Sequence, residues 1–184
     1  MFRLLSLMAV LSLFGCASHP PMKTVDYVDL NRFMGDWYVI ANIPTFIEKD
    51  AHNAVESYRL DKDGTIATTF SFRKGGFDGP RKTYHPRGFV SDRQTNALWG
   101  MQFIWPFKGD FRIVYLDEDY QNTIIARQAR DYVWIMRRDP AIDADTFEQL
   151  RRHIADLGYD ISELKMVPQQ WHKKSSSHVG RESQ

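Results

Sequence analysis

Apolar and polar side chains alternate through most of the chain between residues 37 and 138, which is the period of strands with one buried face. Turns rich in Gly, Asp and Pro separate segments rich in β-branched and aromatic residues. The pattern predicts strands at Trp37–Ile43, Ala54–Leu60, Thr65–Arg73, Lys82–Val90, Ala97–Phe103, Phe111–Leu116, Thr123–Gln128 and Tyr132–Arg138. No segment between them is long enough to be a crossover helix, so neighbouring strands should pair antiparallel.

The period changes after residue 140, where the sequence predicts one amphipathic helix and then a short strand at Lys165–Val167. Asp143 or Asp145 can cap this helix, and Gly158 can end it. Its apolar face consists of Phe147, Leu150, Ile154 and Leu157. The predicted fold is all-β, an eight-stranded antiparallel up-and-down barrel with one C-terminal α-helix packed outside, since closure removes the edge strands.

Composition narrows the class of protein. A chain of 184 residues suits one domain, and 43% hydrophobic with 26% charged residues excludes wholesale disorder. The net charge of +1 gives no overall attraction to nucleic acid, so no nucleic-acid partner is expected. The six histidines are scattered and there is one cysteine, so we expect no metal site. No nucleophile elbow or His-Glu-x-x-His motif occurs, and we predict no catalytic residues, no enzyme and no cofactor.

The N-terminus reads as a targeting segment. Arg3 precedes an apolar run, Leu4–Phe14, that is too short to span a bilayer but suits a signal peptide. Gly15-Cys16 then resembles a bacterial lipobox, in which the thiol is acylated, by palmitate for example. The alternative is a plain secretory signal with an incidental cysteine. We predict a signal peptide at residues 1–15, a flexible tether at 16–28, the barrel at 29–168 and a disordered tail at 169–184.

Three motifs in order resemble the signatures of the lipocalin family. Gly35-Asp36-Trp37 is similar to the first, Asp117-Glu118-Asp119-Tyr120 to the second, with Glu118 in place of Thr, and Tyr132–Arg138 to the third. Together with the lipobox they resemble the lipidated outer-membrane lipocalins of bacteria. The resemblance implies that Trp37 packs at the closed end of the barrel beside Gly35, with Arg138 lying across the indole. It also implies that acylated Cys16 lies in the outer membrane, because Ala17 and not Asp follows the cysteine, and that the protein faces the periplasm.

Strand alternation selects the side chains that face the barrel interior. The interior set is long, aromatic and mostly uncharged, which suits an acyl chain, because each buried CH₂ contributes about 0.8 kcal/mol. The alternative is that these side chains simply fill the barrel. Trp37, Val39 and Ala41 should share the inward face of the first strand. The candidate lipid-binding residues are Val39, Glu56, Phe70, Phe72, Met101, Phe111, Ile113, Tyr115 and Trp134, although the phase of Met101 is open.

Two features leave alternatives open. Glu56 shares a face with Tyr58, so it either enters the cavity or lies at a solvated rim. The apolar loop Ile104–Phe107 is an entrance lip, a contact with a membrane or second subunit in a homodimer, or ordinary loop packing.

The sequence therefore predicts an outer-membrane lipoprotein that binds fatty acids or lysophospholipids for storage or transport in envelope maintenance. Two rival interpretations are a filled barrel that contacts a periplasmic protein, and a lipid-modifying lipocalin enzyme.

Overall fold

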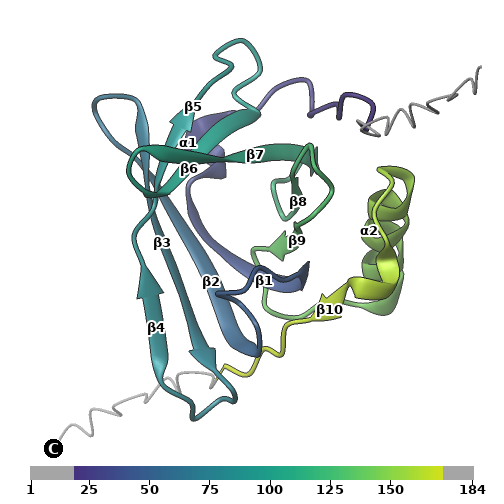
Figure 1. Ribbon diagram of the computed structural model, residues 1–184. Coiled ribbons are helices and arrows are strands. Elements are labelled where there is room, and N and C mark those ends of the chain that lie inside the picture. The colour runs from purple at the N-terminus through teal and green to yellow at the C-terminus, as the bar shows by residue number, and fades with distance from the viewer. Residues whose placement is uncertain (1–18, 172–184) are drawn as a thin grey trace, which may run out of the picture.

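A closed antiparallel barrel forms the body of the molecule (Figure 1). The computed structural model describes residues 19–171. Its elements are α1 (Leu30–Phe33), β1 (Gly35–Ile43), β2 (Ala51–Leu60), β3 (Thr65–Lys74), β4 (Arg81–Tyr84), β5 (Arg87–Val90), β6 (Leu98–Ile104), β7 (Phe107–Leu116), β8 (Asn122–Ala126), β9 (Val133–Arg137), α2 (Ala144–Asp156), η1 (Ile161–Glu163) and β10 (Lys165–Met166). Strand β1 pairs with both β2 and β9, which closes the barrel and confirms the predicted fold.

Two of the predicted strands differ most from the observed ones. The predicted strand Lys82–Val90 is two strands, β4 and β5, both paired with β3, because Pro86 has no amide proton to give to the ladder. Residues 108–110 look like a turn in the sequence but belong to β7, where Gly109 pairs with Met101. The hairpin turn lies instead at Trp105-Pro106.

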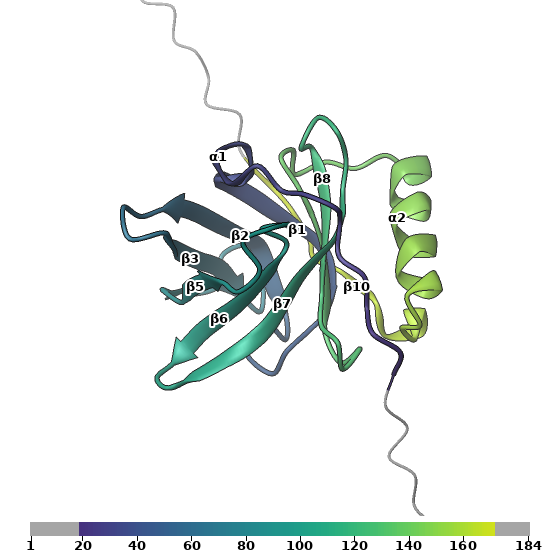
Figure 2. The same ribbon diagram turned by 90° about the horizontal axis from the view of Figure 1, so that it is seen from above.

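Helix α2 packs on the outside of the barrel, as predicted (Figure 2). The Asp143 carboxylate caps it by accepting a hydrogen bond of 2.8 Å from the Thr146 amide, and Gly158 follows with a φ of +89°. Leu150 and Ile154 are buried against outward-facing side chains of the barrel, including Ile124. The outer face of β8 and β9 therefore belongs to this helix and not to a ligand.

The N-terminal segment is attached to the barrel and is not a free tether throughout. Residues 19–28, which we call the strap, run along the outside of the barrel to α1 (Figure 2). The Val25 amide donates to the Ile113 carbonyl at 2.9 Å and the Val28 amide to the Thr95 carbonyl at 2.8 Å. Met22 and Val28 are buried. The prediction of a flexible tether is wrong for residues 22–28, because their apolar side chains complete the core.

The predicted tail also begins too early. Gln169 Nε2 donates to the carbonyls of Val39 at 2.7 Å and Ala54 at 3.2 Å, and the Gln170 backbone amide donates to Asn53 Oδ1 at 2.7 Å. The signal peptide, Cys16 and the rest of the predicted tail lie outside the described residues. Within residues 19–171, no helix has the length and hydropathy to cross a membrane.

Candidate functional site: the barrel cavity

The end of the barrel beside α1 is its base, and aromatic side chains fill and close this end. The rings of Phe33 and Trp37 lie 5.0 Å apart, and Tyr58 contacts Phe33 at 5.6 Å. Trp99 stacks on Phe111 with centroids 5.0 Å apart and planes 9° from parallel. We call these five residues the aromatic base. Such aromatic pairs stabilise a core by about 0.5–1.5 kcal/mol each beyond the area they bury.

Arg138 lies across the underside of this base, as the resemblance implies. Its guanidinium carbon is 3.9 Å from the centroid of the Trp37 ring. Nη2 donates to the carbonyls of Arg32 and Met34, each at 2.8 Å, and Nη1 donates to the Asp36 carbonyl at 2.8 Å. Gly35 has a φ of +95°, and a Cβ there would lie 3.3 Å from Arg138 Nη1. The Gly-x-Trp motif thus gives the arginine room to reach the indole.

Above the base the barrel is hollow. A cavity of about 310 Å³ lies there, at the lower end of the range for small-molecule sites. Its apolar wall includes Phe70, Met101, Phe111, Ile125, Trp134 and Met136. Phe46, Phe103, Ile104 and Phe107 line the cavity and are also half or more exposed, so they mark its mouth. We call these four residues the apolar rim. The cavity can therefore hold a narrow apolar molecule that enters past the apolar rim.

The structure brings most of the predicted ligand-binding side chains to the interior. Glu56, Phe70, Met101, Phe111 and Trp134 line the cavity. Val39, Phe72 and Ile113 are buried in the same interior core, but they do not line the cavity. The open phase of the fifth predicted strand is now fixed, because Trp99 and Met101 point inward.

Tyr115 points the other way, so its place in the predicted site is wrong. A β-bulge between Ile113 and Tyr115 shifts the alternation of β7, and the Tyr115 ring contacts His153 of α2 at 5.3 Å. A bulge between Val39 and Ala41 does the same in β1, where Ala41 joins the helix-side core. An extra residue in one strand reverses the face of every side chain after it.

Glu56 lies inside the barrel, which decides between the two positions left open. It is on β2 opposite Trp37 and Phe70, directly above Tyr58 of the aromatic base. The Tyr58 hydroxyl donates to Glu56 Oε2. Burial raises the pKa of Glu56 to about 7, against the lowering effect of the Tyr58 hydrogen bond, and the negative charge of Glu48 adds to the rise.

Glu48 is a cavity residue that strand alternation could not find. It lies in the segment between β1 and β2, yet it is only 7% exposed. Its carboxylate accepts hydrogen bonds from Asn42 Nδ2 at 2.7 Å, Trp134 Nε1 at 2.8 Å and Thr45 Oγ1 at 3.1 Å. Burial raises the pKa of Glu48, although these donors oppose the rise. In the sequence it looks like any polar residue in a connection.

Comparison with known proteins agrees with this geometry. Residues 28–169 match the family described as the lipocalin-like domain. The chain belongs to the lipocalin family. The lipocalin is 34% identical to temperature-induced lipocalin-1 of Arabidopsis thaliana over 155 residues, which cover 80% of this chain and 83% of the plant protein. It is 29% identical to the outer membrane lipoprotein Blc of Citrobacter freundii, with 84% of this chain and 89% of that protein covered.

Solved structures place the lipocalin in the same fold. Insecticyanin from the tobacco hornworm Manduca sexta superposes with a TM-score of 0.64 at 16% identity, over 80% of this chain and 84% of that one. The cockroach allergen Per a 4 gives a TM-score of 0.60 at 20% identity, over 83% and 96%. At these identities the likeness concerns the fold alone.

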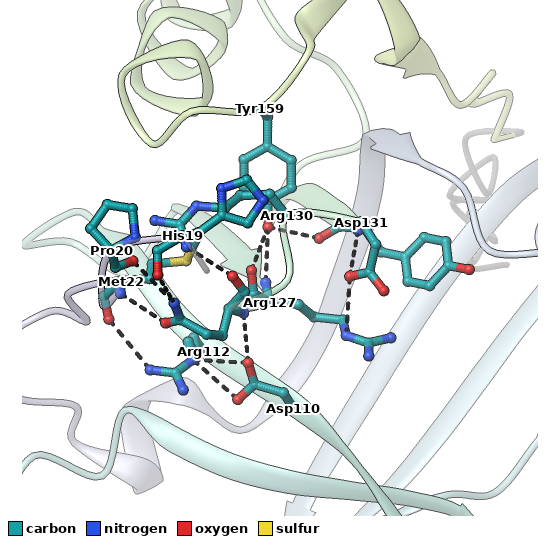
Figure 3. A network of polar contacts seen from close by, with 11 residues as sticks. His19, Pro20, Met22, Asp110, Arg112, Arg127, Arg130, Asp131 and Tyr159 are labelled. Atoms are coloured by element: carbon teal, nitrogen blue, oxygen red, sulfur yellow. Dashed lines mark hydrogen bonds and ion pairs between the residues drawn. The ribbon is translucent and has the colours of Figure 1, made fainter. Parts of the chain in front are cut away.

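In this lipocalin, a polar network joins the strap to the cavity mouth (Figure 3). Gln128 Nε2 donates to the carbonyls of His19 at 3.3 Å and Pro20 at 3.0 Å, and its Oε1 accepts from the Met22 amide at 2.8 Å. The Gln128 amide in turn donates to Asp110 Oδ2 at 2.7 Å. Asp110 lines the cavity, so the strap begins at the mouth end of the barrel.

Proposed function

We propose that this lipocalin is an outer-membrane lipoprotein that binds one single-chain lipid, a fatty acid or lysophospholipid, and stores or carries it in envelope maintenance. The observation that carries the proposal is the apolar cavity of about 310 Å³ between the aromatic base and the apolar rim. That volume suits one alkyl chain better than a two-chain lipid. It also favours a ligand-binding protein over the rival in which a filled barrel only presents its loops.

The names of the bacterial relatives and the sequence around Cys16 support the location. The proteins of Citrobacter freundii and Escherichia coli are called outer membrane lipoproteins. Cys16 is three residues before His19, which is held at the mouth, and three residues span at most about 11 Å. Acylation of Cys16 would therefore anchor the protein near its entrance, so that the mouth faces the periplasmic side of the bilayer. The apolar rim is then available to membrane lipid or to a second copy in a homodimer.

No described feature favours the enzyme interpretation, and the family relationship supports a binding role. A carrier retains its ligand unchanged, whereas an enzyme turns it over. Mass spectrometry of an organic extract of the protein purified from cells should therefore detect intact fatty acid or lysophospholipid. An extract without lipid would favour a protein-interaction role instead.

Titration of delipidated protein with a fluorescent fatty acid tests the proposal directly. We expect saturable binding that changes the fluorescence of Trp134, which lines the cavity. Gly109 also lines the cavity, and a Cβ there would find its nearest atom, the Met101 carbonyl oxygen, 3.6 Å away. Gly109→Leu should fill the cavity and weaken binding at least tenfold.

Gly76→Leu is the matched control, because Gly76 lies in the connection between β3 and β4 and a Cβ there meets no atom within 4 Å. Its affinity should equal that of the unmodified protein. Absence of saturable binding, or equal affinity of the Gly109→Leu variant, would contradict a ligand site in this cavity.

A further inference from the structure

The cavity is polar at its floor and apolar at its mouth. A fatty acid that enters tail first would need the opposite arrangement. Its floor holds the carboxyl group of Glu56, directly above the aromatic base, and Glu48 adds a second buried carboxyl group at its side. Its mouth is the apolar rim. A tail-first fatty acid would place its alkyl end against Glu56 and its charged end among exposed phenylalanine side chains.

The two interior carboxylates have no cationic partner among residues 19–171. The ion pairs in that part of the chain all involve acidic residues other than Glu48 and Glu56. Glu48 is nevertheless well satisfied, because it accepts three hydrogen bonds from neutral donors. The negative charge of this pair is thus left to solvent or to a ligand.

One carboxylate oxygen of Glu56 accepts no hydrogen bond from the described residues. The Tyr58 hydroxyl occupies Oε2, and no described group donates to Oε1. Oε1 is not sealed in the core, because it keeps some accessible surface and Glu56 lines the cavity. A ligand in the cavity that carries a hydrogen-bond donor can therefore reach this oxygen.

The charges nearer the mouth are already neutralised. Arg112 Nε donates to both oxygens of Asp110, at 3.1 and 2.9 Å. Arg127 Nε lies 3.3 Å from Asp131 Oδ1, and its guanidinium is 5.2 Å from the centroid of the Tyr132 ring. The unpaired charge that remains in the cavity is therefore negative and lies at its floor.

We propose that the cavity takes a cationic single-chain amphiphile head first, with its ammonium group on Glu56 Oε1 and its alkyl chain leading out past the apolar rim. The proposal rests on the hydrophobic cavity of the proposed function and adds a second class of ligand, a long-chain primary amine. The ammonium supplies both the missing donor and the missing positive charge. In a site of low dielectric such a charge-assisted hydrogen bond is stronger than a neutral one.

A ligand series on the unmodified protein tests this without any variant. Dodecylamine, dodecan-1-ol and dodecanoate share one chain length and differ only in the head group. At pH 8.5 the amine is cationic and Glu56 is ionised. Calorimetry below the micelle concentrations should give at least tenfold tighter binding for the amine than for the alcohol, and the weakest binding for the carboxylate.

Glu56→Gln removes the charge and keeps the size of the side chain. We expect the preference for the amine over the alcohol to fall below twofold in this variant. Glu163→Gln makes the same charge change at an exposed position outside the barrel and should keep the full preference. Both proteins should show the same circular dichroism as the parent.

The possible outcomes separate this inference from the proposed function. Binding of dodecanol or dodecanoate with no preference for the amine overturns the inference and leaves a lipid site intact. A preference for the amine that survives in Glu56→Gln also overturns it, since the selectivity then comes from other charges. If none of the three ligands binds, the proposed function itself is wrong.

Discussion

Glu56 is a residue whose chemistry depends on the fold around it. In the unfolded chain its carboxyl group ionises near its ordinary pKa of 4.5, whereas in the folded protein burial raises that pKa to about 7. Between these two values the folded state binds more protons than the unfolded state. The stability that this group contributes is therefore greatest in acid and declines as the pH rises from about 4.5 to about 7.

Replacement of Glu56 by Gln should consequently stabilise the protein at pH 8 and do little at pH 5. One pKa unit corresponds to about 1.4 kcal/mol, so the rise from 4.5 to about 7 sets an upper limit of about 3.5 kcal/mol on the gain at pH 8. Urea unfolding at the two pH values measures the difference. Glu163→Gln should show no such dependence on pH, and an equal effect of Glu56→Gln at both values would contradict burial of an ionised carboxylate.

Arg138 acts through the shape of its guanidinium and not only through its charge. It donates to the carbonyls of Arg32, Met34 and Asp36 while it covers the Trp37 ring. Lysine has no planar fork and cannot make these contacts together. Arg138→Lys should lower the free energy of unfolding by about 2–4 kcal/mol, from the lost hydrogen bonds and cation–π contact.

Thermal and urea unfolding would measure this loss. Arg59→Lys is the matched control, because its side chain is largely exposed and, among residues 19–171, pairs only with Asp61. Its effect should stay below about 0.5 kcal/mol. A similar small effect of Arg138→Lys would mean that the arginine does not hold the base of the barrel together.

Strand β7 shows how far alternation can be trusted at the scale of an element. The pattern correctly places Phe111 and Ile113 inside, but it fails at Tyr115, because the bulge after Ile113 leaves no mark in the hydrophobic pattern. Val114 and Tyr115 are both apolar enough to suit either face. The existence and order of the strands can therefore be predicted from sequence, whereas the direction of a side chain beyond a bulge depends on pairing with the neighbouring strand.

Helix α2 offers a test of a boundary that the sequence left open between Asp143 and Asp145. Asp143 is the cap, since its side chain accepts from the Thr146 amide. Asp143→Ala should cost about 1 kcal/mol of stability, as for other lost N-caps. Asp145→Ala removes only a first-turn charge and should cost less than half of that, as urea unfolding would reveal. Equal losses would contradict this assignment of the cap.

The whole molecule combines a filled and a hollow part within one barrel, and the sequence pattern does not predict this division. Phe111 belongs to both halves, because it stacks on Trp99 below and lines the cavity above. Composition and alternation predict an aromatic interior, but whether it is filled depends on how the rings pack across strands far apart in the chain. Glu48 could not be predicted for the same reason, because the groups that surround it, Asn42 and Trp134, lie on other elements.

The proposed acylation of Cys16 leads to a prediction about the protein in cells. The strap runs along the outside of the barrel, and every residue that lines the cavity lies between Thr45 and Met136. Cys16→Ser should therefore release the protein from the membrane fraction of cells without changing its affinity for lipid. A net charge of +1 cannot replace the proposed acyl chains, because it gives little attraction to anionic lipid.

Immunoblots of soluble and membrane fractions, together with ligand titration of both proteins, would measure these two properties. Ala17→Ser is the matched control, since it alters the neighbouring position and keeps the thiol. It should remain in the membrane fraction. Persistent attachment of Cys16→Ser would show that another part of the protein holds the membrane. The apolar rim would then be the first surface to alter, because its four residues are exposed beside the mouth.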